Sequence, residues 1–397
     1  MTTRSVILAG ARTPIGKFQG ALAALRAVDL GAVAIREALV RSSVEPEQIE
    51  YTIMGHVLQA GQGQITARQA AVAAGIPKES PAITVNKVCL SGMSAIAMAD
   101  QMIRAGEVEI VVAGGMESMT NAPFLLPKAR EGSRLGDSPM VDSLIHDGLW
   151  CAFDDRHMGA GTDAISAELG VTREDQDARA ARSHERARDA WEQGRLADEV
   201  VAVEVPQRKG APILFGRDEG VRPDTTTERL SRLRPAFTPD GTVTAGNASQ
   251  ISDGAAAVVV ASAEVAHRMN REPIAEIVAY GMAADRYPSL HTVPALALQK
   301  AAKRASLDVA DLGLFEVNEA FAAVPVHTAR MLGVDDASVN ANGGAVALGH
   351  PIGASGARIV LTLAMEMRRR GVDLGGAAIC GGGGQGDALI LRGAPGS

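Results

Sequence analysis

The chain has 397 residues, more than a single hydrophobic core usually serves, so we expect two domains with an appended region. Hydrophobic residues make up 46%, charged residues 21% and aromatic residues 3%, and the 43 glycines complete a composition typical of an α/β protein with small interior side chains. The net charge of −7 argues against a general affinity for nucleic acid.

Two features of the sequence bear on the compartment. No apolar run approaches the roughly twenty residues that cross a bilayer, and the N-terminus leads into a strand pattern rather than a signal peptide. The three cysteines are odd in number and lack paired spacing. We therefore expect no membrane insertion and a reducing, cytoplasmic location.

The first third of the chain alternates strand and helix patterns. Apolar runs predict strands at 6–9, 53–55, 82–88 and 109–113, and helical periodicity predicts helices at 29–40, 66–74 and 91–105. Strands that alternate with helices indicate parallel pairing.

The segment 121–244 breaks this rhythm, with a charged helical stretch at 173–195 among loops rich in proline and glycine. Alternation resumes with a strand at 255–261, and a second α/β unit begins near residue 273. We therefore predict three parts. They are an N-terminal domain of residues 1–120 completed by 245–271, an inserted loop domain of residues 121–244, and a C-terminal domain of residues 272–397.

The two halves of the chain repeat one arrangement. A helix opens at Ser91-Gly92 and closes at Gly106, and another opens at Ser355-Gly356 and closes at Gly371. A strand follows each helix, and the second strand, 377–379, ends at Cys380. We interpret this as a duplicated α/β unit whose reactive residues lie where the two copies meet.

Two reactive side chains, Cys89 and His350, lie on turns rich in glycine or serine. Cys89 ends an apolar strand and precedes the helix at Ser91, whose dipole is expected to lower the pKa of the thiol. The alternative for Cys89 is a small buried hydrophobe. His350 lies in the irregular stretch 342–353 and is a candidate base, or alternatively a loop histidine that serves only hydrogen bonding.

Cys380 precedes four glycines, which leave the backbone N–H groups of Gly381 and Gly382 free to point at an oxyanion. The alternative is a glycine hinge with an incidental thiol. Asn318 is a candidate to position a water, or a helix cap. Cys151 is expected to be structural. Thiols and an imidazole beside exposed backbone predict acyl transfer through a thioester.

Other binding patterns fail on inspection. Gly381, Gly383 and Gly386 follow a strand, but a further strand rather than a helix comes next, so a dinucleotide site is not expected. The stretch 10–17 has one residue too many between its glycines for a phosphate loop. No Cys-x-x-Cys or His-Glu-x-x-His occurs, so we expect no metal and no tightly bound cofactor.

With these motifs in order, the chain resembles the thiolase family, and within it the acetyl-CoA acetyltransferases, over essentially its whole length. The matching stretches are 85–92, 113–119, 234–237, 242–249, 318–321, 349–353 and 380–383. The resemblance implies the duplicated five-layered αβαβα thiolase fold, with an inserted loop domain that carries the CoA-binding surface. It also implies a homotetramer built as a dimer of dimers.

The resemblance implies a reaction in which two acetyl-CoA give acetoacetyl-CoA and CoA, reversible by thiolysis. Cys89 is then the nucleophile that accepts the acetyl group, His350 takes its proton, and Cys380 removes the α-proton of the second acetyl-CoA. Asn318 holds a water that acts with His350 on the enolate oxygen. The backbone N–H groups of Cys89 and Gly382 stabilise the tetrahedral oxyanion.

By the same resemblance, CoA thioesters are substrates rather than resident cofactors. The positions implied in the CoA channel are His157, Met158, Arg222, Phe237, Ala245, Ser249, Ala320 and Phe321. From the sequence alone, a solvated surface charge is the alternative for Arg222. The stretch 290–294 and the ending at 385–387 depart from the better-known members, which leaves the acyl chain length open.

Two alternatives remain at this stage. The first is a degradative 3-ketoacyl-CoA thiolase of fatty-acid β-oxidation, which places the same chemistry on longer substrates in fatty acid metabolism. The second is a non-catalytic thiolase-like carrier of acyl-CoA or lipid, which we expect to lack one of the reactive groups.

Overall fold

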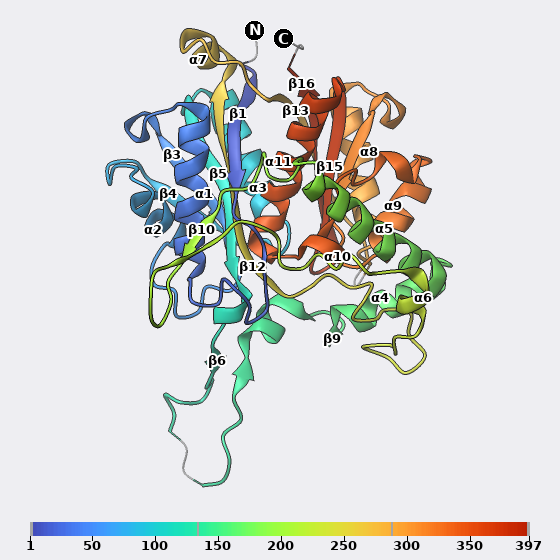
Figure 1. The fold of residues 1–397 in the computed structure, drawn as a ribbon. Coiled ribbons are helices and arrows are strands. Elements are labelled where there is room, and N and C mark those ends of the chain that lie inside the picture. Colours follow the sequence, from blue (N-terminus) through green and yellow to red (C-terminus); the bar gives the residue numbers. More distant parts are fainter. Residues whose placement is uncertain (1–2, 133–134, 287–288, 395–397) are drawn as a thin grey trace.

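The computed structural model describes residues 3–132, 135–286 and 289–394, so the outermost residues of the two expected terminal domains lie outside the described residues. Figure 1 shows the N-terminal half, in blue and cyan, beside the C-terminal half, in orange and red, with both ends of the chain at the same end of the molecule.

The N-terminal half is built on five strands that pair in the order β1-β12-β5-β3-β4. The elements are β1 (Ser5–Arg12), α1 (Ala27–Ser42), β3 (Tyr51–Gly55), α2 (Thr66–Ala73), β4 (Ala82–Val85), α3 (Ser91–Ala105), β5 (Ile110–Ser118) and β12 (Ser252–Ser262), and the short β2 (Gly16–Lys17) pairs with β12. Every strand and helix predicted for this half is confirmed. The strand predicted at 82–88 ends early, at Val85, because the chain turns at Val88, whose φ is +51°.

The C-terminal half repeats the scheme with strands in the order β14-β15-β16-β13. Its elements are β13 (Ala275–Ala284), α8 (Val293–Ala305), β14 (Leu314–Val317), α9 (Ala323–Leu332), α10 (Ala345–Leu348), α11 (Ile352–Arg370), β15 (Leu374–Gly381) and β16 (Gln385–Gly393). Strand β1 also pairs with β13 through residues 5–7 and 275–277, so one hydrogen-bonded path joins both halves into a ten-stranded sheet.

The prediction of parallel pairing is only partly right. Strand β3 pairs in parallel with β4 and β5, and β14 pairs in parallel with β15, because helices cross over between these strands. The pairings among β1, β5, β12, β13, β15 and β16 are antiparallel. The reason is clear for β15 and β16, since the glycine turn at 382–384 between them is too short for a crossover and forms a hairpin.

Side chains of the sheet alternate between separate hydrophobic clusters. In β5, Val111 and Ala113 belong to a central cluster with α3 and α11, whereas Val112 belongs to an outer cluster with α1 and α2. In β16, Leu389 belongs to the central cluster and Ile390 to an outer cluster with α8. The strands of each half are therefore covered on both faces, by the shared central helices on one face and by outer helices on the other. This confirms the five-layered αβαβα arrangement.

The central layer consists of the two helices of the predicted repeat. Helix α3 ends at Gly106 and α11 ends at Gly371, each in the left-handed region, and the strands β5 and β15 follow. The helices lie close together, because a Cβ added at Gly92 would lie 2.8 Å from the Ala357 backbone N. The duplicated unit is confirmed, and its two copies meet at α3 and α11.

Residues 121–244 contribute no strand to the ten-stranded sheet in the described part of the chain. Their elements are β6 (Phe124–Leu125), β7 (Val141–Asp142), the helical turn η3 (Leu144–Leu149), β8 (Trp150–Cys151), β9 (Arg156–His157), α4 (Met158–Glu168), α5 (Arg173–Glu192), β10 (Val203–Val205), β11 (Ile213–Phe215) and α6 (Thr227–Ser231). Helix α5 confirms the charged helix predicted at 173–195. Figure 1 shows the segment that carries β6 projecting away from the body of the molecule.

The remaining short elements lie at the ends of the main ones. They are η1 (Pro46–Gln48), η2 (Met119–Asn121), α7 (Ala263–Arg268), η4 (Val309–Asp311) and η5 (Asp336–Ser338). Among all helices of the described residues, none is long and apolar enough to cross a membrane.

Candidate active site

The three predicted reactive turns converge at one end of the central layer. Cys89 precedes α3, His350 precedes α11, and Cys380 lies near the end of β15. The Cys89 and Cys380 turns are in contact, because a Cβ added at Gly381 would lie 2.7 Å from the Leu90 side chain. Close packing of the first turns of α3 and α11 brings the His350 turn to the same place.

The sulfur of Cys89 lies in a buried pocket of backbone N–H groups. The side chain is 3% exposed, and burial raises the pKa of the thiol to about 12. Within this balance the backbone N–H groups of Cys89 and Gly382 donate hydrogen bonds to the sulfur and lower the pKa, while the Glu117 carboxylate acts in the same direction as burial. The prediction of a lowered pKa is therefore wrong, because desolvation outweighs the donors at the start of α3.

Cys380 is equally buried, with 1% of its surface exposed. Burial raises the pKa of its thiol, and the nearby Cys89 sulfur adds to that effect. This interaction places both sulfurs in one site. At rest both thiols are therefore protonated, and a base must take the proton when either one reacts.

His350 is 5% exposed, and its Nδ1 lies 2.6 Å from Ser355 Oγ. The hydroxyl of Ser355 donates to the carbonyl of Pro351 at 3.0 Å. Because a hydroxyl has one hydrogen, both contacts are satisfied when the imidazole carries its proton on Nδ1 and donates it to Ser355. Nε2 is then a free acceptor, and it has no partner among the described residues.

The charge state of His350 suits this role. Burial, with a smaller contribution from the Arg358 guanidinium, lowers the pKa of the imidazole to about 3. The ring is therefore neutral at physiological pH, and its unpaired Nε2 can accept a proton.

Asn318 directly follows β14 and is fully buried. Its backbone N–H donates to the Ala378 carbonyl at 3.0 Å, which holds the residue beside β15. Neither polar atom of its side chain has a partner among the described residues. The alternative of a helix cap is wrong, since the residue that caps the following helix, α9, is Ala322. A buried amide of this kind suits hydrogen bonding to a ligand or a water.

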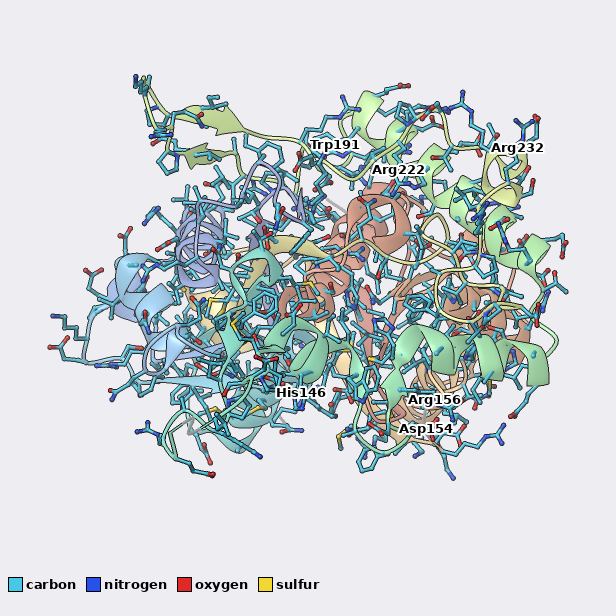
Figure 2. All side chains as sticks on the ribbon, turned by 90° about the horizontal axis from the view of Figure 1, so that it is seen from below. His146, Asp154, Arg156, Trp191, Arg222 and Arg232 are labelled. Carbon is cyan, nitrogen blue, oxygen red and sulfur yellow. The ribbon has the colours of Figure 1, made fainter. Side chains whose placement is uncertain are left out.

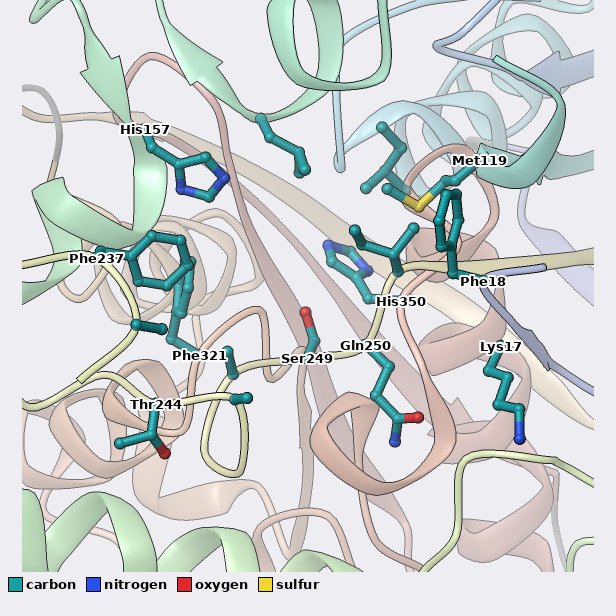
Figure 3. A pocket seen from close by; sticks show the side chains of 16 residues that line it. Lys17, Phe18, Met119, His157, Phe237, Thr244, Ser249, Gln250, Phe321 and His350 are labelled. Carbon is teal, nitrogen blue, oxygen red and sulfur yellow. The ribbon is translucent and has the colours of Figure 1, made fainter. Parts of the chain in front are cut away.

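A cavity of about 510 Å³ opens onto His350. Figure 3 shows the imidazole between His157, Phe237 and Phe321 on one side and Phe18 and Met119 on the other. The His157 ring stacks on Phe237 with 4.5 Å between centroids, and Phe237 meets the edge of Phe321 at 6.3 Å. These three rings form one wall of the cavity. The predicted residues that line the cavity are His157, Phe237, Ala245, Ser249, Phe321 and His350.

The other predicted residues lie off the cavity wall. Cys89, Cys380, Asn318 and Gly382 do not line the cavity, so His350 is the predicted catalytic residue that it exposes. Met158 and Ala320 are buried in the hydrophobic cluster that contains Phe321, and the Ala320 carbonyl accepts from the Ser249 N–H at 3.0 Å. Both residues therefore support the wall from behind.

Arg222 does not line the cavity either, but its loop borders it. Gln250, which lines the cavity, donates to the Gly220 carbonyl at 3.0 Å. The Arg222 backbone N–H donates to Nδ1 of His184 at 3.1 Å, which anchors the loop to α5. Figure 2 shows Arg222 in the view from below, away from His146 and Arg156. The exposed Arg222 therefore lies near the cavity without forming its wall.

Sequence reasoning missed two residues that support the site. Ser355 sets the tautomer of His350, and Glu117, fully buried at the end of β5, accepts the N–H groups of Val57, Leu58 and Gly353 at 3.0–3.2 Å. Glu117 thus ties β5 to the start of α11 beside Cys89. A carboxylate inside an apolar strand was the available signal, since such a group needs several donors.

The described residues offer no set of ligands for a metal ion. Within residues 3–132, 135–286 and 289–394, no group of three or more His, Cys, Asp or Glu side chains is placed to hold a metal ion.

Comparison with known proteins agrees with this geometry. The family description "Thiolase, N-terminal domain" matches residues 5–264, and "Thiolase, C-terminal domain" matches residues 271–393. The chain is 55% identical to a probable acetyl-CoA acetyltransferase of Mycolicibacterium smegmatis, over 98% of this chain and 100% of the relative. It is 49% identical to an acetyl-CoA acetyltransferase of Thiocystis violacea, over 99% of this chain and 100% of that protein.

A solved structure is similar over the same extent. The crystal structure of the Bacillus anthracis acetyl-CoA acetyltransferase superposes with a TM-score of 0.96 at 39% sequence identity and covers 99% of both chains. These matches agree with the site, in which two buried thiols and a neutral imidazole lie on a duplicated α/β fold. The chain belongs to the thiolase family.

Proposed function

We propose that this protein is an acetyl-CoA C-acetyltransferase, which condenses two acetyl-CoA to acetoacetyl-CoA and CoA and reverses the reaction by thiolysis. The observation that carries the proposal is the meeting of the Cys89 and Cys380 turns beside His350, with the Gly382 N–H donating to the Cys89 sulfur. The printed names of the relatives from Mycolicibacterium smegmatis and Thiocystis violacea support it.

The first half-reaction uses Cys89 and His350. As the sulfur attacks the thioester carbonyl, the thiol proton moves to the free Nε2 of His350, and the departing CoA thiolate takes that proton. The developing oxyanion receives hydrogen bonds from the N–H groups of Cys89 and Gly382. Such donors are worth about 3 kcal/mol each where water is excluded.

The second half-reaction uses Cys380 as the base. Nε2 of His350 first takes the thiol proton of Cys380, and the resulting thiolate removes an α-proton from the second acetyl-CoA. The protonated Nε2, with a water held by Asn318, then donates a hydrogen bond to the enolate oxygen. The enolate carbon attacks the acetyl carbonyl, the C–S bond to Cys89 breaks, and acetoacetyl-CoA forms. The Cys89 thiolate then regains a proton from Nε2 of His350, which restores both thiols and the neutral imidazole.

The cavity supports binding of CoA thioesters as substrates rather than as resident cofactors. The stacked rings of His157 and Phe237 with Phe321 form an apolar wall that suits the pantetheine arm. Arg222, on the loop that borders the cavity, then meets the phosphorylated nucleotide. In this scheme residues 121–244 form the loop domain that carries much of the CoA surface.

We also propose a homotetramer assembled as a dimer of dimers. The projecting segment between β5 and η3 exposes large apolar side chains, with Phe124 62%, Leu126 52% and Met140 64% exposed. Apolar groups of this size on a projecting hairpin favour contact with another chain.

We further propose a cytoplasmic location, because three free thiols suit a reducing compartment.

The test compares thiolysis of acetoacetyl-CoA with thiolysis of a long-chain 3-ketoacyl-CoA. Faster turnover of acetoacetyl-CoA is expected. Faster turnover of the long-chain substrate assigns the protein to degradative thiolysis in fatty acid metabolism. Binding of acyl-CoA without any turnover identifies a carrier and refutes the proposal.

A further inference from the structure

A fully buried carboxylate lies between the two cysteine turns. Asp387, on β16, has no exposed surface, and its Oδ1 pairs with Lys87 Nζ at 2.7 Å. Its Oδ2 accepts the hydroxyl of Ser94 at 2.7 Å, and the Tyr280 hydroxyl also hydrogen-bonds to the carboxylate. A buried carboxylate is tolerated only when it is paired and its oxygens are satisfied, so this group depends on its partners.

The partners of Asp387 come from the region around Cys89. Lys87 lies two residues before Cys89, and Ser94 lies in the first turn of α3. On the other side, Cys380 pairs with Gly386 across β15 and β16, directly before Asp387. One carboxylate therefore links the segment that carries Cys89 to the hairpin that carries Cys380.

The link also reaches the oxyanion donor. Gly382 lies in the turn between β15 and β16, and its N–H donates to the Cys89 sulfur. The two turns also meet through the apolar packing of Leu90 on Gly381 and of Val88 on Gly382. Because packing contacts are weakly directional, the ion pair and its hydrogen bonds define the relative position of the turns more narrowly.

The two residues are 300 positions apart in the chain, and both are unusual at their places. Lys87 is a cation two residues from a buried thiol, and it keeps only 26% of its side chain exposed. Asp387 is an acidic residue buried in β16 directly before the apolar run 388–391. For packing alone, an apolar residue would serve better at either place.

We propose that Lys87 and Asp387 are positioning residues that hold the Cys89 and Cys380 turns at the separation which the two-sulfur step requires. This inference rests on the proposed function. Acetyl transfer between CoA molecules needs Cys89 and His350, whereas thiolysis of acetoacetyl-CoA also needs Cys380. Loss of the ion pair should therefore slow thiolysis more than transfer.

The experiment measures both reactions in one set of variants. Exchange of the acetyl group between acetyl-CoA and isotopically labelled CoA reports the one-sulfur reaction, and acetoacetyl-CoA thiolysis reports the two-sulfur reaction. For Lys87→Met and for Asp387→Asn we expect thiolysis kcat to fall about tenfold or more. Exchange should fall by a smaller factor, because it shares the Gly382 donor but does not use Cys380. Misplacement of reacting groups by about 1 Å can cost up to about a hundredfold in rate.

Three further variants sharpen the result. Lys87→Arg keeps the charge and should retain a ratio of thiolysis to exchange near the wild-type value. The double variant Lys87→Met with Asp387→Asn should lose no more thiolysis than either single variant, because the two residues act as a unit. Arg268→Gln breaks an exposed ion pair with Glu109 outside the site and should change neither reaction.

The outcomes separate the two hypotheses. A wild-type protein without exchange and without thiolysis refutes the proposed function. If the wild-type protein has both activities, single variants that lose exchange and thiolysis by the same factor refute the positioning role. A double variant whose loss of thiolysis equals the product of the two single losses refutes it as well. Either result leaves the ion pair a contribution to stability alone. Melting temperatures of all variants identify any that do not fold, and Asp387→Asn, which keeps the shape of the side chain, decides the question if Lys87→Met fails to fold.

Discussion

Nδ1 of His350 lies 2.6 Å from Ser355 Oγ, while Nε2 of the same ring is buried without a partner among the described residues. The Ser355 hydroxyl donates its hydrogen bond to the Pro351 carbonyl at 3.0 Å, so the imidazole proton is held on Nδ1, away from the free Nε2. This relationship prepares a neutral histidine to accept a proton from a thiol whose pKa burial has raised to about 12.

Replacement of Ser355 tests that relationship. Ser355→Ala should lower kcat for acetoacetyl-CoA thiolysis by about tenfold with KM changed less than about twofold, because one hydrogen bond of about 1.4 kcal/mol no longer selects the tautomer. Ser355→Thr keeps the hydroxyl and should retain most of the activity. Equal kcat for wild type and Ser355→Ala would show that the ring is held by other contacts.

The separate roles of the Cys89 and Cys380 thiols are tested by mass spectrometry after the protein is mixed with acetyl-CoA. Cys89→Ser should abolish the acetyl-enzyme, whereas Cys380→Ser should still be acetylated on Cys89 but should fail to condense. Cys151→Ser is the matched control, since this buried thiol belongs to β8, pairs with Arg156 of β9 and takes no part in the proposed reaction. An acetyl group found on Cys151 or Cys380 of the wild-type protein contradicts the assignment.

The depressed pKa of His350 predicts a loss of stability on acidification. Between pH 6.5 and about 3 the unfolded imidazole binds a proton that the folded one does not, so the free energy of unfolding falls as pH falls through this window. From pH 7 to pH 5 this one group should remove about 2 kcal/mol.

Urea unfolding of wild type and His350→Asn at pH 7 and pH 5 measures this contribution. The variant should lose about 2 kcal/mol less than the wild type over that interval. Other groups titrate in both proteins and cancel in the difference. An identical loss in the two proteins would mean that the ring gains a proton in the folded state.

A role of Arg222 in nucleotide binding predicts dependence on the substrate. Arg222→Gln should raise KM for acetoacetyl-CoA about tenfold, since a charge-assisted hydrogen bond to a phosphate contributes roughly 1.5 kcal/mol. The KM for the truncated substrate acetoacetyl-pantetheine, which has no nucleotide, should not change. A parallel rise in both KM values would place Arg222 near the acyl end instead.

The projecting hairpin predicts the route of assembly. Phe124→Ser combined with Met140→Ser removes two exposed apolar side chains and should convert tetramers to dimers in light scattering coupled to gel filtration, with thiolysis per chain largely kept. A tetramer that persists in this variant would assign the dimer-dimer contact to another surface.

The sequence by itself determined the order of strands and helices in the first third of the chain, the repeat built on α3 and α11, and the reactive side chains on their turns. These features follow from local rules, since periodicity reports burial and glycine marks turns such as the one at 382–384. The family motifs around Cys89, His350 and Cys380 are contiguous stretches and are visible for the same reason.

Only the tertiary structure decided the antiparallel pairings, the raised pKa of the two thiols, the tautomer of His350 and the ion pair of Lys87 with Asp387. The direction of a strand pairing depends on which strands become neighbours in the sheet, and desolvation depends on every neighbour that excludes water. Neither can therefore be predicted from a local sequence pattern. Lys87 and Asp387 are 300 residues apart, and their charges become partners only because folding stacks the α3 turn against β16.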